Sequence, residues 1–202
     1  MGKFQRKTKD ERRHEIMDAA KRVFIKKGYR YSTMEDVIAN TSLSKGGVYQ
    51  YYKNTKSIMF DIMKEGNFTR FLKTEDIIGK FSSTKDVFEV MTQIAIAKLF
   101  EDIPEKKLYI MFLSEIMYDK ETEKLFYKLE SEGHNYLIKN LESIPQFSSA
   151  KAESKKNVAL LYSRIFNGIL IIYELLGDKN PFLENKKELH DFIYNLMKKI
   201  IS

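Results

Sequence analysis

Cysteine and tryptophan are absent from this chain of 202 residues, and proline occurs only three times. Without cysteine the protein can form no disulfide bond and no thiolate metal site, which is typical of a reducing compartment, so we expect a cytoplasmic protein. The few helix-breaking residues stand between long segments of periodic hydrophobicity, which predicts an all-α fold of about nine helices. We expect no cofactor.

Long apolar runs are also absent. A membrane-spanning helix needs about 18 apolar residues in succession, whereas the longest run here, at 108–113, has six. The N-terminus, MGKFQRKTKDERR, is too polar for a signal peptide. A basic first helix lying on anionic lipid is an alternative, but this helix lacks tryptophan and a large apolar surface. We therefore expect no membrane partner.

The sequence offers little that points to catalysis. Histidine occurs only at three well-separated positions, His14, His134 and His190. No HExxH, GxSxG, P-loop or GxGxxG pattern is present. Aspartate and glutamate are plentiful, but in a chain that is 31% charged they are expected mostly on solvated surfaces. We expect a protein that is not an enzyme and has no metal site.

Positive charge is concentrated in the first quarter of the chain. Residues 1–56 hold 14 Lys/Arg and 6 Asp/Glu, a net charge of +8, whereas residues 57–202 hold 21 and 22, a net charge of −1. A merely solvated lysine-rich surface would not segregate in this way. The asymmetry indicates a nucleic-acid-binding region joined to a nearly neutral domain.

The segment 33–56, TMEDVIANTSLSKGGVYQYYKNTK, predicts two short helices joined by a tight turn. Ser32 or Thr33 can cap the first helix, because each is followed three positions later by an acidic residue. Ser44 can cap the second helix. The inward positions of the helices and the turn are expected to be Met34, Val37, Ile38, Leu43, Val48 and Tyr52.

The rest of the second helix is suited to contact with another molecule. It consists of Lys45, Gly46, Gly47, Tyr49, Gln50 and Tyr51. Two glycines cost a helix up to about 1 kcal/mol each relative to alanine, so their presence suggests close approach by another surface. Lysine, glutamine and tyrosine side chains bind phosphates or read base edges in DNA grooves. A helical hairpin with a tyrosine-rich core face is the alternative.

Residues 15–63 resemble the DNA-binding domain of the TetR (tetracycline-repressor-like) family. The resemblance rests on EIMDAAKRVFIKKGY, on STMEDVIANTSLSKGGVYQYY and on the start of the next helix, in this order. It implies an N-terminal three-helix helix-turn-helix domain and a larger C-terminal helical domain for ligand binding and dimerisation. The implied function is a DNA-binding transcriptional regulator, by default a repressor that leaves its palindromic operator when a small molecule binds. An activator of the same fold is the alternative.

The resemblance also implies roles for individual residues. Lys45 and Gln50 are expected to contact bases, while Gly46 and Gly47 allow close approach of the backbone. Phosphate contacts are expected at Thr33, Tyr49, Tyr51, Thr55 and Lys56. The family commonly has a lysine three positions before Ile58, where this chain has Thr55 followed by Lys56, so either residue can make that contact.

The expected domains follow from these assignments. Residues 1–56 form a basic arm and the helix-turn-helix domain, and residues 57–202 form the ligand-binding and dimerisation domain. The second domain begins with a connecting helix over 57–74, followed by a connection at 75–84. Further helices are expected at 85–100, 104–118, 121–144, 150–176 and 182–201.

The first helix has one clear inward face. It is expected to span residues 10–27 and to end at Gly28 in a left-handed conformation, with Tyr29 packing back on its last turn. The inward positions are Ile16, Ala19, Ala20, Val23 and Phe24.

The last two helices are unusually apolar. The second half of 150–176 is apolar nearly all round, so it must be covered on every side. The final helix can cover only part of it, and a second copy of the chain can supply the rest. The expected interface residues are Leu161, Ile165, Ile169, Ile172, Phe192 and Leu196. Two helices of a monomer core are the alternative, but the resemblance favours a homodimer.

A small-molecule site in the C-terminal domain is implied by the resemblance. Adaptable apolar side chains and interruptions of the apolar pattern supply the candidates Phe68, Met91, Tyr109, Phe112, Glu115, Tyr136, Arg164 and Asn167. An acidic group among aromatic rings suits a hydrophobic cation, whereas Arg164 suits a carboxylate. Arg164 can equally form an ion pair inside the helical bundle or at the dimer interface.

Overall fold

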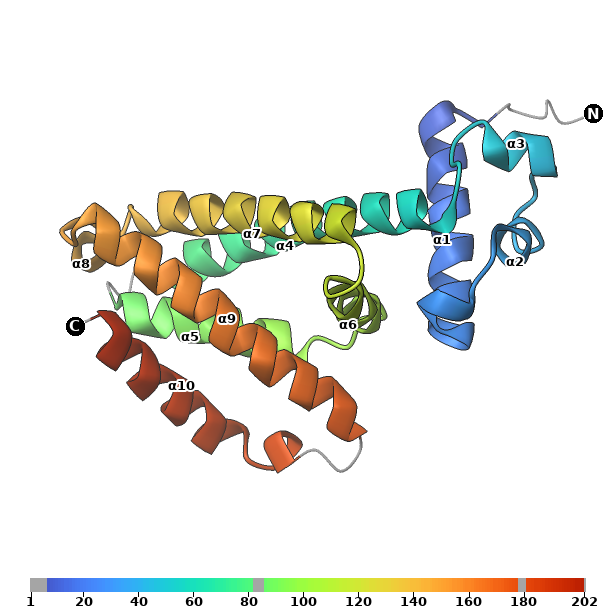
Figure 1. The fold of residues 1–202 in the computed structure, drawn as a ribbon. Coiled ribbons are helices and arrows are strands. Elements are labelled where there is room, and N and C mark those ends of the chain that lie inside the picture. Colours follow the sequence, from blue (N-terminus) through green and yellow to red (C-terminus); the bar gives the residue numbers. More distant parts are fainter. Residues whose placement is uncertain (1–6, 82–85, 178–180, 202) are drawn as a thin grey trace, which may run out of the picture. The chain divides into compact units, whose positions relative to one another are not determined.

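The computed structural model describes residues 7–81, 86–177 and 181–201, which form helices and no strand. The expected all-α fold is confirmed for these residues (Figure 1). The chain divides into two compact units, one made of Met1–Gly66 and Pro104–Phe126 and the other of Asn67–Ile103 and Tyr127–Ser202. The predicted functional boundary after residue 56 remains a prediction.

Helix α1 (Lys9–Lys27) begins the first unit. Thr8 forms a capping box with Glu11, which starts the helix one residue earlier than expected. Gly28 ends the helix with φ at 82°, and the Tyr29 ring then packs edge-on against Phe24 with centroids 5.2 Å apart. The end of the helix at Gly28 and the packing of Tyr29 are as predicted, whereas the Thr8 cap was not predicted. The inward face is also confirmed by the burial of Ile16, Ala19, Ala20, Val23 and Phe24.

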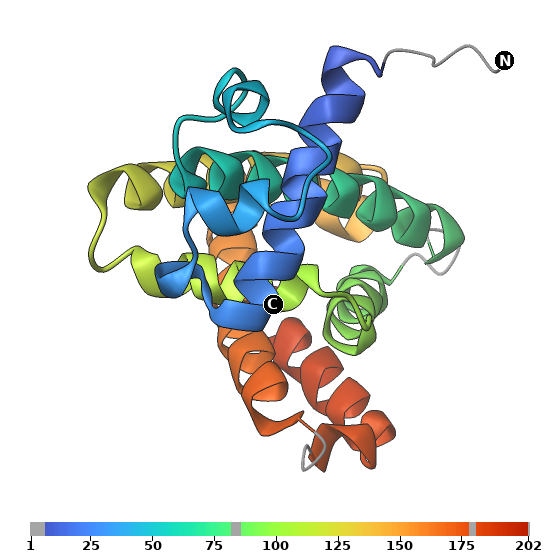
Figure 2. The ribbon, with the colours of Figure 1, turned by 90° about the vertical axis from the view of Figure 1, so that its right-hand side faces the viewer.

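The short helices α2 (Met34–Ile38) and α3 (Lys45–Tyr49) follow the 3-10 turn η1 (Tyr29–Tyr31). Met34 and Val37 of α2 and Val48 of α3 are buried. The first unit also contains the beginning of α4 (Thr55–Phe81) and helix α6 (Glu105–Glu115). Figure 2 shows how α1 crosses α6, against which it packs.

Helix α4 is longer than expected. We predicted that it ends near residue 74 and that a connection follows, but the helix continues to Phe81. The reason is an inward stripe that runs on at helical spacing, since Asn67, Thr74 and Ile78 are all buried. Residues 82–84 of the predicted connection lie outside the described residues.

The second unit is built around α5 (Val87–Phe100), α9 (Ala152–Leu176) and α10 (Lys186–Ile201), which pack on one another. Tyr162 of α9 is buried, and its hydroxyl donates to the carbonyl of Met91 on α5 at 3.1 Å. Helix α10 starts four residues later than predicted, because residues 181–183 form the separate 3-10 turn η4 (Pro181–Leu183).

Residues 121–144 were expected to form one helix, and this prediction was wrong at the C-terminal end. Helix α7 (Lys120–Leu141) stops before Ile144, and a short helix α8 (Pro145–Ser148) follows with Pro145 in its first turn. Proline fixes the backbone and has no N–H to donate, so it suits the start of a new helix rather than the continuation of the old one.

Helix α9 is the most apolar long helix among the described residues. By length and composition it could cross a membrane, with a mean hydropathy of 1.5 over its most apolar stretch, of which 28% is buried inside the chain. Length and composition alone are weak support for a membrane span, because an apolar helix covered by protein has the same properties. Because only 28% of this stretch is buried, much of the apolar surface of α9 is uncovered within one chain.

Candidate nucleic-acid interface

Both helices of the predicted helix-turn-helix are capped by hydroxyl side chains. Thr33 caps α2, accepting from the N–H of Asp36 at 3.2 Å, while its own N–H donates to the Asp36 carboxylate at 2.9 Å. Ser32, the alternative cap, instead donates its hydroxyl to the carbonyl of Gly28 at 2.8 Å. Ser44 caps α3 by accepting from the N–H of Gly47 at 3.2 Å, as predicted.

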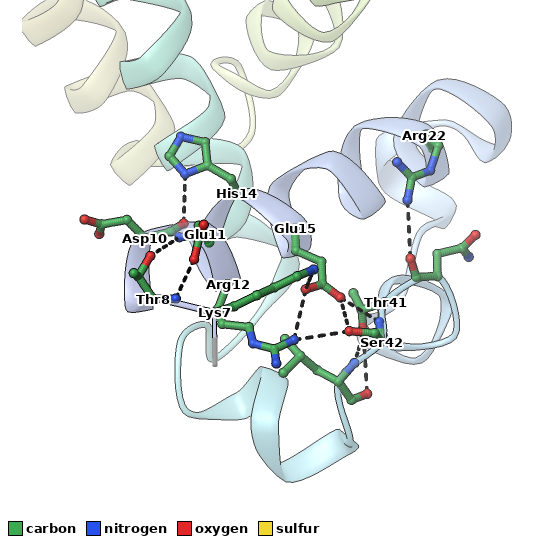
Figure 3. Close-up of polar contacts among 12 residues, drawn as sticks. Lys7, Thr8, Asp10, Glu11, Arg12, His14, Glu15, Arg22, Thr41 and Ser42 are labelled. Atoms are coloured by element: carbon green, nitrogen blue, oxygen red, sulfur yellow. Dashed lines mark hydrogen bonds and ion pairs between the residues drawn. The ribbon is translucent and has the colours of Figure 1, made fainter. Parts of the chain in front are cut away.

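Helix α1 fixes the turn between α2 and α3 through polar contacts (Figure 3). The Glu15 carboxylate accepts from the N–H of Ser42 at 2.7 Å and from its hydroxyl at 2.5 Å. Arg12 donates to the Ser42 hydroxyl at 3.2 Å, and Arg22 donates to the carbonyl of Asn40 at 3.3 Å. The position of α3 relative to α1 is therefore held by side-chain hydrogen bonds as well as by apolar packing.

Glu15 also gathers basic residues. Lys7 donates to its carboxylate at 2.9 Å and Arg12 at 3.1 Å. The hydroxyl of Ser42, together with Lys7, lowers the pKa of Glu15 to about 2, so the group is fully ionised at neutral pH. Our sequence reasoning missed this residue. The sequence signal for Glu15 was its place next to Ile16, at the edge of the inward face of α1. From this edge a side chain can reach a turn that packs against the helix.

The side chains predicted to touch DNA bases are exposed. Lys45 has 68% of its side chain accessible, and its Nζ lies 3.3 Å from a carboxylate oxygen of Glu35. Gln50, directly after α3, is exposed, and the Tyr49 ring lies near the Lys45 ammonium, 6.0 Å from its centroid. One face of α3 thus presents a cation, an amide and a phenol to solvent.

The tyrosines after Tyr49 divide between the interior and the surface. Tyr52 is buried, and its hydroxyl donates to Asp61 at 3.2 Å while Arg13 lies over its ring. Burial, with the nearby Asp61 charge, raises the pKa of Tyr52 to about 12. Tyr51 is half-buried and keeps part of its surface available for a phosphate contact.

The two glycines of α3 differ in their surroundings. A methyl group added at Gly47 would lie 3.3 Å from the Ser44 hydroxyl and 3.4 Å from the Leu43 side chain, so internal packing partly accounts for this glycine. A methyl group added at Gly46 would meet no atom within 4 Å. The surroundings of Gly46 are therefore open, as are those of Gly66, Gly133 and Gly168, and close approach of DNA at Gly46 remains a prediction.

The two candidates for the phosphate contact at the start of α4 both have partners within the first unit. Burial raises the pKa of the Tyr29 phenol, and Thr55 lies close enough to it to lower that pKa by a smaller amount. Lys56 donates to Asp119 at 3.1 Å and to Glu121 at 2.6 Å. Which of the two meets a phosphate remains a prediction.

The predicted ligand-binding residues are divided between the two compact units, and their role remains a prediction. Phe112 is buried and Tyr109 half-buried in the first unit, where Glu115 accepts from Arg30 at 2.7 Å. The other five belong to the second unit: Phe68 is exposed, Met91 is buried, Tyr136 donates to Glu75, Arg164 donates to Glu130 and Asn167 accepts from Lys98.

The predicted dimer residues lie on the uncovered surface of α9 and α10. Leu161 is 46% exposed, Ile172 52% and Phe192 60%, while Ile165, Ile169 and Leu196 are half-buried. Exposed leucines on α9 enlarge the same apolar surface: Leu160, Leu175 and Leu176. Apolar residues in this number are unusual on the surface of a monomer.

The chain is similar to known proteins in two different ways. Residues 16–62 match the family described as bacterial regulatory proteins, tetR family. A curated relative, the HTH-type transcriptional regulator YfiR of Bacillus subtilis, is 41% identical over 64 residues, which cover 32% of this chain and 31% of YfiR. The match to this relative is thus confined to about a third of either protein.

Similarity of fold extends over almost the whole chain. GusR of Salmonella enterica superposes with a TM-score of 0.74 and 15% identity, covering 96% of this chain and 97% of GusR. The SmeT–triclosan complex superposes with a TM-score of 0.64 and 16% identity, covering 92% and 90%. SmeT is described as the repressor of a multidrug efflux pump of Stenotrophomonas maltophilia. The matching family and YfiR are transcriptional regulators rather than enzymes.

Proposed function

We propose that this chain, which belongs to the tetR family through its N-terminal helix-turn-helix domain, is a dimeric, ligand-responsive DNA-binding regulator of transcription in the bacterial cytoplasm. The observation that carries the proposal is the outer face of α3, where Lys45 and Gln50 are exposed beside Gly46, whose surroundings are open. This face lies inside the segment that matches the family.

Base contacts are assigned to the residues that project furthest. Lys45 and Gln50 reach into the major groove, where lysine donates to guanine and glutamine pairs with adenine. Gly46 lets the backbone approach the DNA, and Thr33, Tyr49 and Tyr51 contact phosphates on either side. Because phosphate contacts position the helix and base contacts specify the sequence, these two groups predict different mutant behaviour.

Dimerisation follows from the uncovered apolar surface of α9 and α10. A second copy that packs these helices against its own buries Leu161, Ile172 and Phe192 in a four-helix interface. The same interface removes the need for a membrane around α9. Two copies related by a twofold axis read two half-sites about 34 Å apart, so the operator is palindromic.

The effector is a small molecule bound by the C-terminal domain, and its binding releases the protein from DNA. Two observations support this part of the proposal: the fold similarity to SmeT bound to triclosan, and the description of SmeT as a repressor. An activator with the same architecture is the second candidate. Transcription measured from the operator with and without the protein separates the two.

A DNA-binding experiment with matched lysine variants tests the proposal. DNA fragments selected by the purified protein from a random pool serve as the specific duplex, and a scrambled duplex serves as the reference. Lys45→Ala is expected to weaken specific binding by about 1–3 kcal/mol and to leave binding to the scrambled duplex nearly unchanged. Lys128→Ala is the control, because Lys128 is equally exposed, at 69%, and is likewise paired with a glutamate.

The outcomes are clearly separable. An equal loss on both duplexes would assign Lys45 to a phosphate rather than to a base. A protein that binds no duplex even at low salt would refute the proposed function, because neutralisation of DNA phosphates must make binding steeply dependent on salt.

A further inference from the structure

We propose that Asp119 and Glu121 compete with a DNA phosphate for Lys56, so that DNA binding is restrained by an acidic pair inside the same compact unit. The inference rests on the proposed function and concerns its regulation. Lys56 is one of the two residues assigned to the phosphate contact at the start of α4, and in this structure its ammonium is already bound by two carboxylates.

The geometry is that of an ammonium held between two acceptors. The Nζ of Lys56 lies 3.1 Å from Asp119 Oδ1 and 2.6 Å from Glu121 Oε2. About a third of the Lys56 side chain remains accessible, so a third acceptor can approach the ammonium from solvent. A lysine ammonium has three donors, and a carboxylate and a phosphate oxygen are chemically equivalent partners for them.

Asp119 is a fixed acceptor rather than a freely moving surface group. It caps the start of α7 by accepting from the N–H of Thr122 at 2.9 Å and from its hydroxyl at 2.6 Å. These bonds, followed by Lys56, keep the pKa of Asp119 below its usual value, so the group is ionised. The ion pair between Lys56 and Asp119 therefore depends on the position of the start of α7. A shift at the junction of α6 and α7 would change the distance between the two groups.

The same segment neutralises two more cations of the basic N-terminal quarter. Glu105 lies 3.3 Å from the Nζ of Lys21. Glu115 accepts from Arg30 at 2.7 Å, and the guanidinium of Arg30 also lies over the Tyr118 ring, 4.3 Å from its centroid. The segment 105–121 thus brings four carboxylates to three basic side chains of residues 1–56, and Lys56 is the one of these three that is assigned to DNA.

Ion pairs with this degree of exposure are individually weak, which makes the competition effective. A strong buried pair would remove Lys56 from DNA binding permanently, and a fully exposed one would not restrain it. A weak, doubly bound lysine can be released by a movement of α7 or by a nearby phosphate. The acidic pair thereby sets how much Lys56 contributes to DNA affinity.

The test is a mutant cycle on DNA binding of the full-length protein, measured from low to high salt on one duplex. The variants are Lys56→Met, the double change Asp119→Asn with Glu121→Gln, and all three changes together. Asparagine keeps the helix cap at 119. Glu121→Gln alone is compared with Glu123→Gln, since Glu123 lies two residues away and pairs with Lys120 at 3.0 Å instead.

The expected results follow from counterion release. Freeing Lys56 adds up to one phosphate contact, which steepens the dependence of log affinity on log salt by up to about 0.9 and tightens binding by up to about eightfold at 0.1 M salt. The gain disappears in the triple variant. Lys56→Met alone weakens binding by clearly less than eightfold at 0.1 M salt, because in the wild type the two carboxylates hold the ammonium for part of the time. Glu123→Gln lacks the gain seen with Glu121→Gln.

Three results would overturn the competition while leaving the regulator itself intact. Lys56→Met alone weakens DNA binding about eightfold at 0.1 M salt, the full effect of losing one phosphate contact, which means that the acidic pair does not restrain the lysine. The acidic double variant binds DNA no more tightly than the wild type, which means that the carboxylates do not restrain Lys56. Alternatively, its affinity rises as much with Met at position 56 as with Lys, which means that only net charge matters. If the wild type and all variants fail to bind any duplex, the proposed function is wrong and the competition falls with it.

Discussion

The carboxylate of Glu15 on α1 receives both the backbone N–H and the hydroxyl of Ser42, at 2.7 and 2.5 Å, in the turn that precedes α3. One acidic side chain therefore fixes the segment that presents Lys45 to solvent. It does so in the most basic part of the chain, where a negative charge opposes the approach of DNA.

Replacing Glu15 by glutamine tests whether Glu15 affects DNA binding mainly through its contacts with Ser42 or mainly through its negative charge. Glutamine loses the charged acceptor for Ser42, and a hydrogen bond to a charged group is worth about 1.5–3 kcal/mol. We expect Glu15→Gln to weaken specific DNA binding several-fold. Asp18→Asn removes a charge from the same helix at an exposed position and is expected to leave binding unchanged or slightly tighter. Tighter binding by Glu15→Gln would show that its charge, rather than its contacts, dominates.

The same contact predicts a dependence of stability on pH. Hydrogen bonds from Ser42 and the ion pair with Lys7 lower the pKa of Glu15 from 4.5 to about 2. A lowered pKa stabilises the fold above the unfolded value and the stabilisation is lost as the pH falls through the folded value. We therefore expect the difference in urea midpoint between wild type and Glu15→Gln to shrink between pH 4.5 and 2. A difference that stays constant over this range would contradict the assignment.

Gly46→Ala is expected to change stability and DNA binding in opposite directions. Alanine favours a helix over glycine by up to about 1 kcal/mol, and the added methyl group meets no atom within 4 Å, so the thermal midpoint should rise. DNA binding should weaken, because the methyl group occupies the space of the close approach. Gly66→Ala in α4 is the control, since its surroundings are equally open. Undiminished DNA binding by Gly46→Ala would exclude that approach.

Ile172→Glu is expected to produce monomers. Ile172 is 52% exposed within one chain, so a charge there costs little in monomer stability but a great deal inside an apolar interface. Sedimentation should show a single chain, and operator binding should be lost with the second half-site. Leu72→Glu is the matched control, because Leu72 is 53% exposed on α4, which contributes nothing to the predicted interface. An intact dimer in the Ile172 variant would refute the interface.

Burial of Lys98 in the second unit is expected to destabilise the fold near neutral pH, whereas the contacts of Glu15 stabilise it. Burial, with the charge of Arg70, lowers the pKa of Lys98 from 10.5 to about 7. Between these values the unfolded chain holds a proton that the folded chain has lost, so stability rises with pH from 7 to 10.5. We expect Lys98→Met to be more stable than wild type at pH 7, with the gap closing towards pH 10.5. Lys80→Met, at an exposed position, should show no such trend in urea unfolding.

Local features of the first unit could be predicted because they depend on residues close together in the chain. The end of α1 at Gly28 and the cap at Ser44 each involve residues within about four positions, so spacing alone reveals them. Ser32 and Thr33 were equivalent as caps by spacing. In the structure the Ser32 hydroxyl donates to the carbonyl of Gly28, and Thr33 caps α2.

The extension of α4 and the break before α8 were beyond this reasoning for different reasons. Gly79 and the serines after it resemble a connection, whereas in the structure residues 75–81 are helical and Ile78 is buried, which spacing along the chain does not reveal. Pro145 by itself indicates the end of a helix, but a four-residue helix that begins there has too few positions to show periodicity.

The sequence by itself determined the helical class, the inward face of α1, the cap at Ser44 and the basic first quarter, because these depend on composition and on short, regular spacing. Only the tertiary structure decided that Glu15 holds Ser42 and that Lys56 is bound by Asp119 and Glu121. Lys56 and its partners are more than sixty positions apart, and the pairing of distant charges is set by how helices pack rather than by any pattern along the chain.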